Sequence, residues 1–407
     1  MQLRPAANEP ESQAQRLRKA DFLHPGYPGK AVLLSLPALD DGGIDFDTAL
    51  AACGLVAGNR WSDGSFSLDR SAAVSVERPS DGVLREPEYF FQLPGPLDPP
   101  YPIVPRFSHW LFPHDNLPPL WQRWAADATA ATRTGEVARR CVLSNYGDGL
   151  EMAHLLPASE DDWWYSNRMQ RYSPMQLFSS SPINGPANLL TLRADLHRVF
   201  DERHFCLVPK VGDNSGGDAD PLESPQLVLH VFNSTPSGQL PGLWHNRAAH
   251  PIPATVAVEC LFARFAWTVL SPSVFDMFLP SALVPRRLLL WSRDKGEWET
   301  EEASPEMCRQ LWMNSRSRSP RKRSAPRSTG AAEELLVGES LGLYDSGYSR
   351  TDASEDDVYY YDDELGTAER QEEEPRGRSR KRRLSSEAER DCDDFGQSSR
   401  RRKMLFS

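Results

Sequence analysis

The chain has 407 residues, 34 of them proline, with 39% apolar side chains and a formal net charge of −11 at pH 7. The low apolar fraction and the many prolines predict that part of the chain is disordered, and the acidic balance excludes a generic nucleic-acid-coating protein, which would be basic. No run approaches the roughly 18 apolar residues of a membrane span, and the six cysteines include no CxxC pair, so we expect a soluble intracellular protein without a membrane partner.

The first part of the chain predicts an α+β extension behind a disordered N-terminus. Residues 1–28 are polar and contain prolines, and we expect them to be disordered. The extension covers residues 29–118 and ends in a proline-rich run with aromatic residues, which predicts an ordered loop packed on a core. Its predicted elements are a buried strand at 31–36, a helix at 46–56 and short strands within 65–76 and 89–93.

The next predicted domain, residues 119–210, carries the candidate chemistry. Pro119 opens a helix towards Arg140, because proline is tolerated in the first helical turn. Two short pieces follow. Leu150 to Pro157 reads LEMAHLLP and predicts a strand, whereas Asn188 to Asp201 reads NLLTLRADLHRVFD and predicts a helix at its end.

His154 lies in the predicted strand, in an apolar context. An imidazole has an unperturbed pKa of about 6.5 and can accept a proton from water near neutral pH. The alternative is a core histidine that hydrogen-bonds a backbone carbonyl.

His197 and Asp201 are four residues apart on the predicted helix, so their side chains share one face. A ring nitrogen and a carboxylate oxygen can converge there on a divalent ion. The alternative is a surface pair joined by a hydrogen bond. Asn188 follows an Asn-Gly-Pro turn. Its side chain can hold the loop by bonding backbone groups, and the alternative is that it is an ordinary turn residue.

The order and spacing of these pieces resemble an HNH endonuclease domain of the ββα-metal type, in a form common among fungal proteins. In that family the second and third motif elements read N-x3-L-x4-H-x3-H. The same offsets hold Asn188, Leu192, His197 and, in place of the last histidine, Asp201. The resemblance extends over about residues 120–295.

The resemblance implies a metal-dependent endonuclease that hydrolyses phosphodiester bonds of nucleic acid, taken here as DNA. It implies His154 as the general base, Asn188 as the residue that organises the loop, and His197 and Asp201 as metal ligands. The ion would be Mg²⁺ or Mn²⁺, with Zn²⁺ as an alternative, and no small-molecule cofactor is expected. Glu151 is a further candidate ligand, although a regular strand would turn it to the face opposite His154.

The sequence departs from the family pattern at two positions. Ala153 stands directly before the base, where many HNH domains have a metal ligand, and Leu196 stands where a zinc-knuckle cysteine would fall. Ala153 and the acidic balance of the chain favour the alternative, a catalytically degenerate HNH fold that binds nucleic acid or protein in the nucleus. A third hypothesis is a regulatory scaffold that acts through its tail.

The rest of the chain predicts a C-terminal helical cover over residues 211–304 and a disordered charged tail over residues 305–407. The cover holds a strand candidate from Gln226 and a helix candidate from Thr255 to Leu270. Basic clusters at residues 376–383 and 400–403 indicate nuclear import, the alternative being a cytoplasmic protein with solvated tail charge. The predicted fold is thus α+β: an HNH/ββα-metal core, an N-terminal α+β extension, a helical cover and a long disordered tail.

Overall fold

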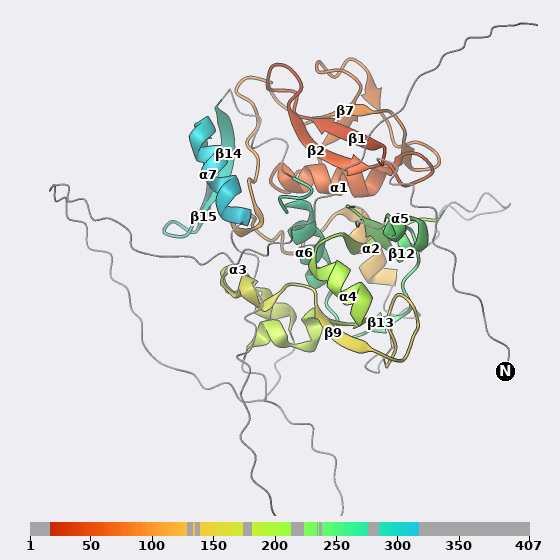
Figure 1. Ribbon diagram of the computed structural model, residues 1–407. Coiled ribbons are helices and arrows are strands. Elements are labelled where there is room, and N and C mark those ends of the chain that lie inside the picture. The colour runs from red at the N-terminus through yellow and green to blue at the C-terminus, as the bar shows by residue number, and fades with distance from the viewer. Residues whose placement is uncertain are drawn as a thin grey trace, which may run out of the picture. The chain divides into compact units, whose positions relative to one another are not determined.

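The computed structural model describes most of the chain between residues 17 and 316. The described residues are 17–127, 133–134, 139–173, 181–212, 224–233, 235, 238–275 and 285–316. All of them belong to one unit of the chain, residues 1–325. They form helices and several small sheets (Figure 1), which confirms the predicted α+β class. Among the described helices, none combines the length and the apolar character that crossing a bilayer requires.

A five-stranded sheet organises the N-terminal part, in the order β2-β1-β7-β4-β5. β1 pairs antiparallel with β2 and parallel with β7. β4 joins β7 to β5 through antiparallel pairs, and a separate antiparallel pair is formed by β3 and β6. The bounds are β1 Lys19–Leu23, β2 Val32–Pro37, β3 Ile44–Asp45, β4 Ser65–Ser67, β5 Ser75–Val76, β6 Val83–Leu84 and β7 Glu88–Gln92.

Helix α1 (Phe46–Val56) occupies the residues predicted for it, and Asp45 fixes its start. The Asp45 carboxylate accepts a hydrogen bond from the backbone N–H of Thr48 at 2.8 Å. Such an N-cap contributes about 0.5–2 kcal/mol to stability. The helix packs on β2 and also contacts helix α6 (Val258–Val269), so it connects the N-terminal sheet to the rest of the core.

The prediction that residues 1–28 are disordered is wrong for the second half of this range, because β1 lies there. Phe22 and Leu23 are 0% and 2% exposed. The strand is stabilised by pairing with β7, more than sixty residues away along the chain. Strand formation depends on such partners more than on local preference, so a five-residue segment that contains Lys19 and Asp21 gave no local signal. Residues 1–16 lie outside the described residues.

The central part begins with α2 (Pro119–Asp127), which starts at the predicted proline and buries Trp121 and Trp124. β9 (Leu150–His154) and β10 (Leu189–Arg193) then form an antiparallel pair, and α4 (Ala194–Asp201) follows β10 directly. α3 (Asp161–Ser166) lies between the two strands in sequence. Short 3-10 helices occupy Phe107–His109, Ala158–Glu160, Met169–Tyr172, Pro182–Asn184 and Pro186–Asn188.

The C-terminal part is not only helical, in contrast to the predicted cover. β11 (Phe205–Lys210) pairs antiparallel with β12 (Gln226–Val231), and β14 (Arg286–Ser292) forms a hairpin with β15 (Glu297–Ala303). β13 (Ile252–Pro253) pairs with β8 (Arg133–Thr134), and α5 (Gln239–Trp244) precedes α6. A last helix, α7 (Pro305–Arg316), begins where the sequence predicts disorder, and its Cys308 is buried. The predicted boundary at residue 305 is therefore wrong, while residues 317–407 lie outside the described residues.

Helix α6 is the element around which the core is built. Every residue of it except Glu259 is buried, and it contacts α1, α2 and β11. Phe262 packs its ring edge against Trp61 at 5.6 Å and against Trp121 at 5.2 Å between ring centroids. Full burial of a large apolar side chain stabilises a fold by about 1.5–3 kcal/mol. The N-terminal extension and the central part therefore share one hydrophobic core.

Candidate active site

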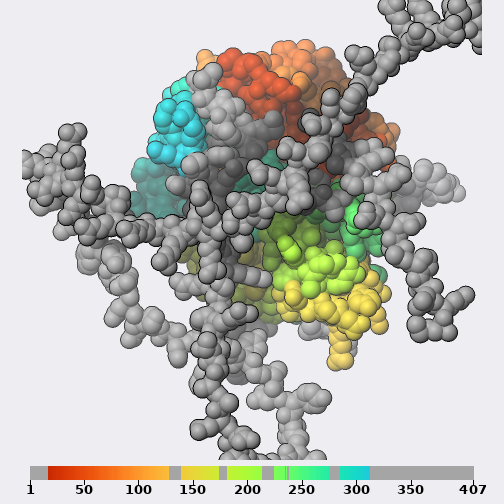
Figure 2. All heavy atoms as spheres, in the orientation of Figure 1, coloured from red at the N-terminus to blue at the C-terminus, as the bar shows by residue number. Residues whose placement is uncertain are grey.

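β9, β10 and α4 form a ββα unit that brings the two motif pieces of the sequence together. His154 lies opposite Leu189 and Glu151 lies opposite Leu192, with no shift of register. Because side chains alternate along a strand, Glu151 shares the face of the buried Leu192, and His154 belongs to the other face. α4 contacts both strands. The unit reaches the surface of the molecule, as the yellow and light green atoms of Figure 2 show.

Asn188 is fully buried and joins the loop before β10 to the segment after β9. Its Oδ1 accepts from the backbone N–H of Leu156 at 2.9 Å. Its Nδ2 donates to the carbonyl of Leu156 at 2.7 Å and to that of Ile183 at 2.8 Å. One amide side chain thus satisfies three backbone groups that no α-helix or β-strand pairs. These bonds fix the chain immediately after His154.

Asn188→Ala is expected to lower the free energy of unfolding by about 2–4 kcal/mol, because it leaves buried backbone groups unpaired, at about 1–3 kcal/mol each. Urea denaturation of the wild-type protein and the variant measures the loss. Asn184→Ala is the matched control, since its side chain bonds a partly exposed imidazole, and we expect it to cost less than about 1 kcal/mol. Equal losses in the two variants would contradict this account of Asn188.

His154 stands at the end of β9 and is partly exposed. Its Nε2 lies 3.0 Å from Oδ1 of Asn184. An amide oxygen only accepts hydrogen bonds, so Nε2 carries the proton in this arrangement and Nδ1 keeps the lone pair. A neutral imidazole with one nitrogen held and the other nitrogen basic is the form a general base requires. Asn184 was read in the sequence only as part of a turn, and nothing in the local pattern indicated this contact.

His197 stands between two carboxylates. Its Nδ1 is 2.7 Å from Oε2 of Glu151, and its Nε2 is 3.5 Å from Oδ2 of Asp201, one helical turn away. The imidazole is mostly covered at 19% exposure, while the side chains of Glu151 and Asp201 are 52% and 62% exposed. The structure therefore brings all three candidate ligands of the sequence together, but at two different nitrogens of one ring.

The arrangement fits a divalent ion held by two of the three groups. If Nδ1 donates its proton to Glu151, the Nε2 lone pair faces a carboxylate oxygen of Asp201. Two ligand atoms that share an ion at about 2.1 Å each are about 3.0 Å apart at adjacent octahedral positions and about 3.4 Å apart at tetrahedral ones. The 3.5 Å found here is therefore within a few tenths of an ångström of both geometries. Glu151 then occupies the position of the carboxylate that orients a metal-binding histidine through its second nitrogen.

The basic and aromatic side chains near the unit are mostly engaged. Arg193 forms two bonds to Asp195, at 2.6 and 2.7 Å, and Arg203 stacks on Trp267 with its guanidinium carbon 3.5 Å from the ring centroid. Arg198 has an 82% exposed side chain and forms a surface ion pair with Glu202, with 3.4 Å between Nε and Oε1. Trp163 and Trp164, for which base stacking was considered, are 4% and 0% exposed. Both indoles therefore pack in the core.

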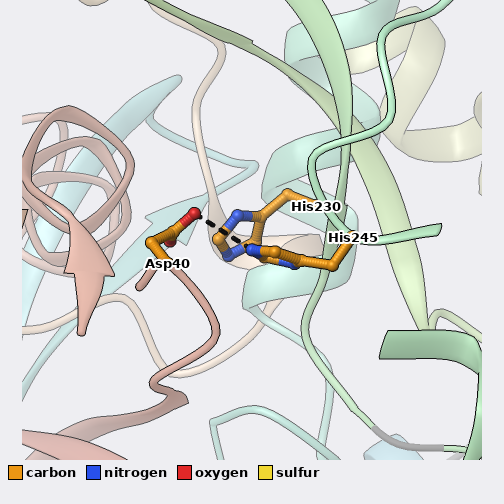
Figure 3. Close-up of side chains that lie close together, drawn as sticks. All are labelled: Asp40, His230 and His245. Carbon is orange, nitrogen blue, oxygen red and sulfur yellow. Dashed lines mark hydrogen bonds and ion pairs between the residues drawn. The ribbon is translucent and has the colours of Figure 1, made fainter. Parts of the chain in front are cut away.

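A second cluster of potential ligands lies away from the ββα unit and consists of Asp40, His230 and His245 (Figure 3). Asp40 lies in the turn before β3, His230 on β12 and His245 just after α5. Oδ1 of Asp40 accepts from Lys210 at 2.6 Å, from Asn246 at 2.7 Å and from His245 Nε2 at 3.0 Å. Its Oδ2 accepts from the backbone N–H of Asp45 at 2.9 Å. The carboxylate is thus fully hydrogen-bonded.

This cluster is an ion-pair network rather than a metal centre. Nδ1 of His245 accepts from the N–H of Val231 at 3.2 Å while Nε2 donates to Asp40, so neither nitrogen offers a free lone pair. The Lys210 ammonium already supplies the positive charge. Burial by itself raises the pKa of the Asp40 carboxyl, but the His245 hydrogen bond and the Lys210 charge outweigh it and hold that pKa well below its usual range. The network ties the N-terminal extension to β11.

His230 is the unsatisfied member of this cluster. It is fully buried, and neither ring nitrogen has a hydrogen-bond partner within the described part of the chain. Burial, with the nearby charge of Lys210, holds the pKa of His230 well below its usual value. The unfolded chain takes up a proton below about pH 6.5 that the folded chain does not, so stability falls as the pH drops through this range.

His230→Phe is expected to remove this penalty, because phenylalanine fills the site and has no proton to gain. Relative to wild type, the variant should gain about 2 kcal/mol when the pH is lowered from 7.5 to 5, at about 1.4 kcal/mol for each pH unit below 6.5. Urea denaturation at both pH values measures it, with the exposed His250→Phe as the matched control. A variant whose pH dependence equals that of wild type would refute the assignment.

The site combines four features: an antiparallel strand pair followed by a helix, a histidine at the end of the first strand, a buried asparagine that holds the loop, and a His/Asp pair on the helix. This combination is that of the ββα-metal endonuclease class. Residues 141–208 match the model of a family described as HNH endonuclease. The match supports an HNH endonuclease domain over this segment of the chain, which confirms the resemblance seen in the sequence. Searches of curated proteins and of solved structures gave no match. A domain of this family is of nuclease type and implies a nucleic-acid substrate.

Proposed function

We propose that the chain is a metal-dependent endonuclease that hydrolyses phosphodiester bonds of DNA. The observation that carries the proposal is the placement of His197 Nε2 at 3.5 Å from Asp201 Oδ2, with Nδ1 held by Glu151 at 2.7 Å. A nitrogen and an oxygen ligand that can share an ion, together with an imidazole base held at the end of the same strand pair, are the parts that phosphodiester hydrolysis requires. The HNH family match supports the same reaction class.

In this proposal the metal ligands are His197 and Asp201, and Glu151 acts through His197. HNH endonuclease domains use a divalent metal, and the small donor set suits Mg²⁺ or Mn²⁺, which keep several waters; Zn²⁺ is the alternative. Bound there, the ion would supply positive charge that stabilises the pentacovalent phosphate and the leaving oxygen. Glu151 fixes the tautomer and the ring orientation of His197 by accepting from Nδ1.

His154 would take a proton from the attacking water through Nδ1, because Nε2 is held by Asn184. Asn188 keeps the chain after His154 in place through its bonds to Leu156. Arg198 is open enough to contact a phosphate. The ion would lie with α4, on the face of the strand pair that carries Glu151, whereas His154 belongs to the other face. The substrate phosphate would therefore have to reach around the end of β9.

The metal half of the proposal is tested by calorimetric titration of the full chain with Mn²⁺. We expect one site in the wild-type protein and at least a tenfold weaker affinity in Asp201→Ala. Asp195→Ala is the matched control, because Asp195 lies on the same helix with a similarly exposed side chain but pairs with Arg193. A wild-type protein that binds no Mn²⁺, or equal affinities in the two variants, would exclude these ligands.

The degenerate binding module remains the second candidate, favoured by the buried, apolar Ala153 in front of His154. It predicts binding of nucleic acid without metal dependence and without cleavage. We also propose nuclear localisation from the basic clusters at residues 376–383 and 400–403, which lie outside the described residues. Fluorescence microscopy tests this, since changing the basic residues of both clusters to alanine should then move a tagged chain to the cytoplasm.

A further inference from the structure

Arg264 places a positive charge inside the core, directly beneath the candidate active site. It lies on α6 and is 1% exposed. Its guanidinium carbon is 3.5 Å from the ring centroid of Phe200 and 4.7 Å from that of Trp267. Nη1 donates to the carbonyl of Leu155 at 3.2 Å, and Nη2 donates to the carbonyl of Phe200. A single planar group thus joins two separate backbone segments.

The two carbonyls belong to the residues next to the candidate catalytic groups. Leu155 directly follows His154, and Phe200 directly precedes Asp201 and lies less than one helical turn after His197. No hydrogen bond connects His154 with His197 or Asp201 in the described part of the chain. Arg264 therefore connects, through two bonds, the strand end that carries the base and the helix end that carries the ligand pair.

A residue that only filled space here would not need a charge. Burial lowers the pKa of Arg264 to about 9, which leaves the group charged at neutral pH. Its Nε has no hydrogen-bond partner within the described residues. Burying a charge without a close counter-ion is unfavourable, and apolar residues of similar volume often replace such groups without loss of stability. The positive charge is, however, well placed at the carboxyl end of α4, where helix carbonyls concentrate negative potential.

We propose that Arg264 is a positioning residue that fixes His154 relative to the His197–Asp201 pair. A planar guanidinium donates two bonds in a fixed geometry, so both segments are held to one rigid group on α6, the most buried helix of the core. The role in cleavage rests on the proposed nuclease function, whereas the connection of the two segments can be tested without it. Its acceptors are backbone carbonyls, which are present whatever side chains residues 155 and 200 carry. The two hydrogen bonds therefore depend on the side chain of residue 264.

The test compares the full-length variants Arg264→Met and Arg264→Lys with Arg286→Met. Methionine is a long, unbranched side chain without the guanidinium group and its donors. Lysine keeps the positive charge but has a single donor nitrogen. Arg286 is the matched control, because it is also a buried arginine, 4% exposed and 4.6 Å from the Tyr27 ring, on β14 and outside the HNH segment. Each protein is examined by Mn²⁺ titration, by nuclear magnetic resonance of the histidine ring nitrogens, and by cleavage kinetics.

In Arg264→Met we expect kcat to fall 10–100-fold with KM for DNA unchanged, and the Mn²⁺ affinity to fall about tenfold. The ring signals of both His154 and His197 should shift or broaden, and Arg264→Lys should lie between Met and wild type. Arg286→Met should match wild type in all three measurements. A folded Arg264→Met with the kcat, metal affinity and ring signals of the control would overturn the proposal; if Met prevents folding, the same comparison with Arg264→Lys decides.

Failure of the nuclease function gives a different result. A wild-type chain that neither binds Mn²⁺ nor cleaves refutes the proposed function, yet the ring signals of His154 and His197 still report on the connection. Shifted signals in Arg264→Met then support the positioning role, and unchanged signals refute it.

Discussion

Replacing His154 by alanine is expected to lower the rate of metal-dependent DNA cleavage by about 10²–10⁴-fold, the usual contribution of a general base. Nε2 of His154 is held by Asn184 at 3.0 Å, which leaves Nδ1 as the basic atom. Alanine removes the base and leaves the pinned loop intact, because the bonds of Asn188 go to the backbone of Leu156 and Ile183. The rate is measured under single-turnover conditions with saturating Mn²⁺.

The control for this variant is His250→Ala, which also removes an imidazole, from an exposed position in the loop before β13. It should cleave at the wild-type rate. His154→Ala should also keep the Mn²⁺ affinity of the wild-type protein, since its ring makes no bond to His197 or Asp201 in the described residues. A rate loss of less than tenfold would show that His154 is not the base.

Asp40→Ala is expected to cause the largest loss of stability, about 3–5 kcal/mol in the free energy of unfolding, because removing one partner of a buried pair leaves the other charge uncompensated. The side chains of Lys210 and Asp40 are 9% and 6% exposed, with Nζ and Oδ1 2.6 Å apart. His245 and Asn246 would lose the same acceptor. Urea denaturation at pH 7 gives the free energy of unfolding.

The double variant Asp40→Ala with Lys210→Met separates the lost ion pair from simple cavity formation. If the stranded ammonium causes the loss, the double variant should be more stable than Asp40→Ala alone. The pKa of Asp40 is held low in the folded chain, so its contribution is complete above about pH 4 and is lost only as the pH falls further. A double variant that is less stable than Asp40→Ala would contradict the ion-pair explanation.

The elements that could be predicted are those whose signal is local. Helix α1 was predicted at its observed bounds from the residue pattern of 46–56, and the structure adds the Asp45 cap. β9 and α4 were predicted because residues on one face recur every two positions in a strand and every three to four in a helix, and a short stretch of sequence shows which spacing applies. β1 was missed because its partner β7 lies far along the chain, and α7 because its residues adjoin a low-complexity region.

In the candidate site, too, the features with a local signal could be predicted, and the contacts between distant residues could not. The His197–Asp201 contact follows from helical spacing alone, and Asn188 was found from the spacing of the family motif. The contacts that hold the site in place join distant parts of the chain: Arg264 to Leu155 and Phe200, Glu151 to His197, and Asp40 to Lys210. The pattern of residues along one chain does not show which distant residues come into contact. They become visible only when the core around α6 is assembled.

The most direct test of the account is the conversion of supercoiled plasmid DNA to nicked or linear forms by the full-length protein. We expect conversion with Mn²⁺ or Mg²⁺, none with EDTA, and none above background in His154→Ala or His197→Ala. Duplex RNA under the same conditions shows whether DNA is the preferred substrate. No metal-dependent cleavage of either nucleic acid by the wild-type chain, or cleavage by both variants at the wild-type rate, would contradict the nuclease assignment and leave a nucleic-acid- or protein-binding HNH domain.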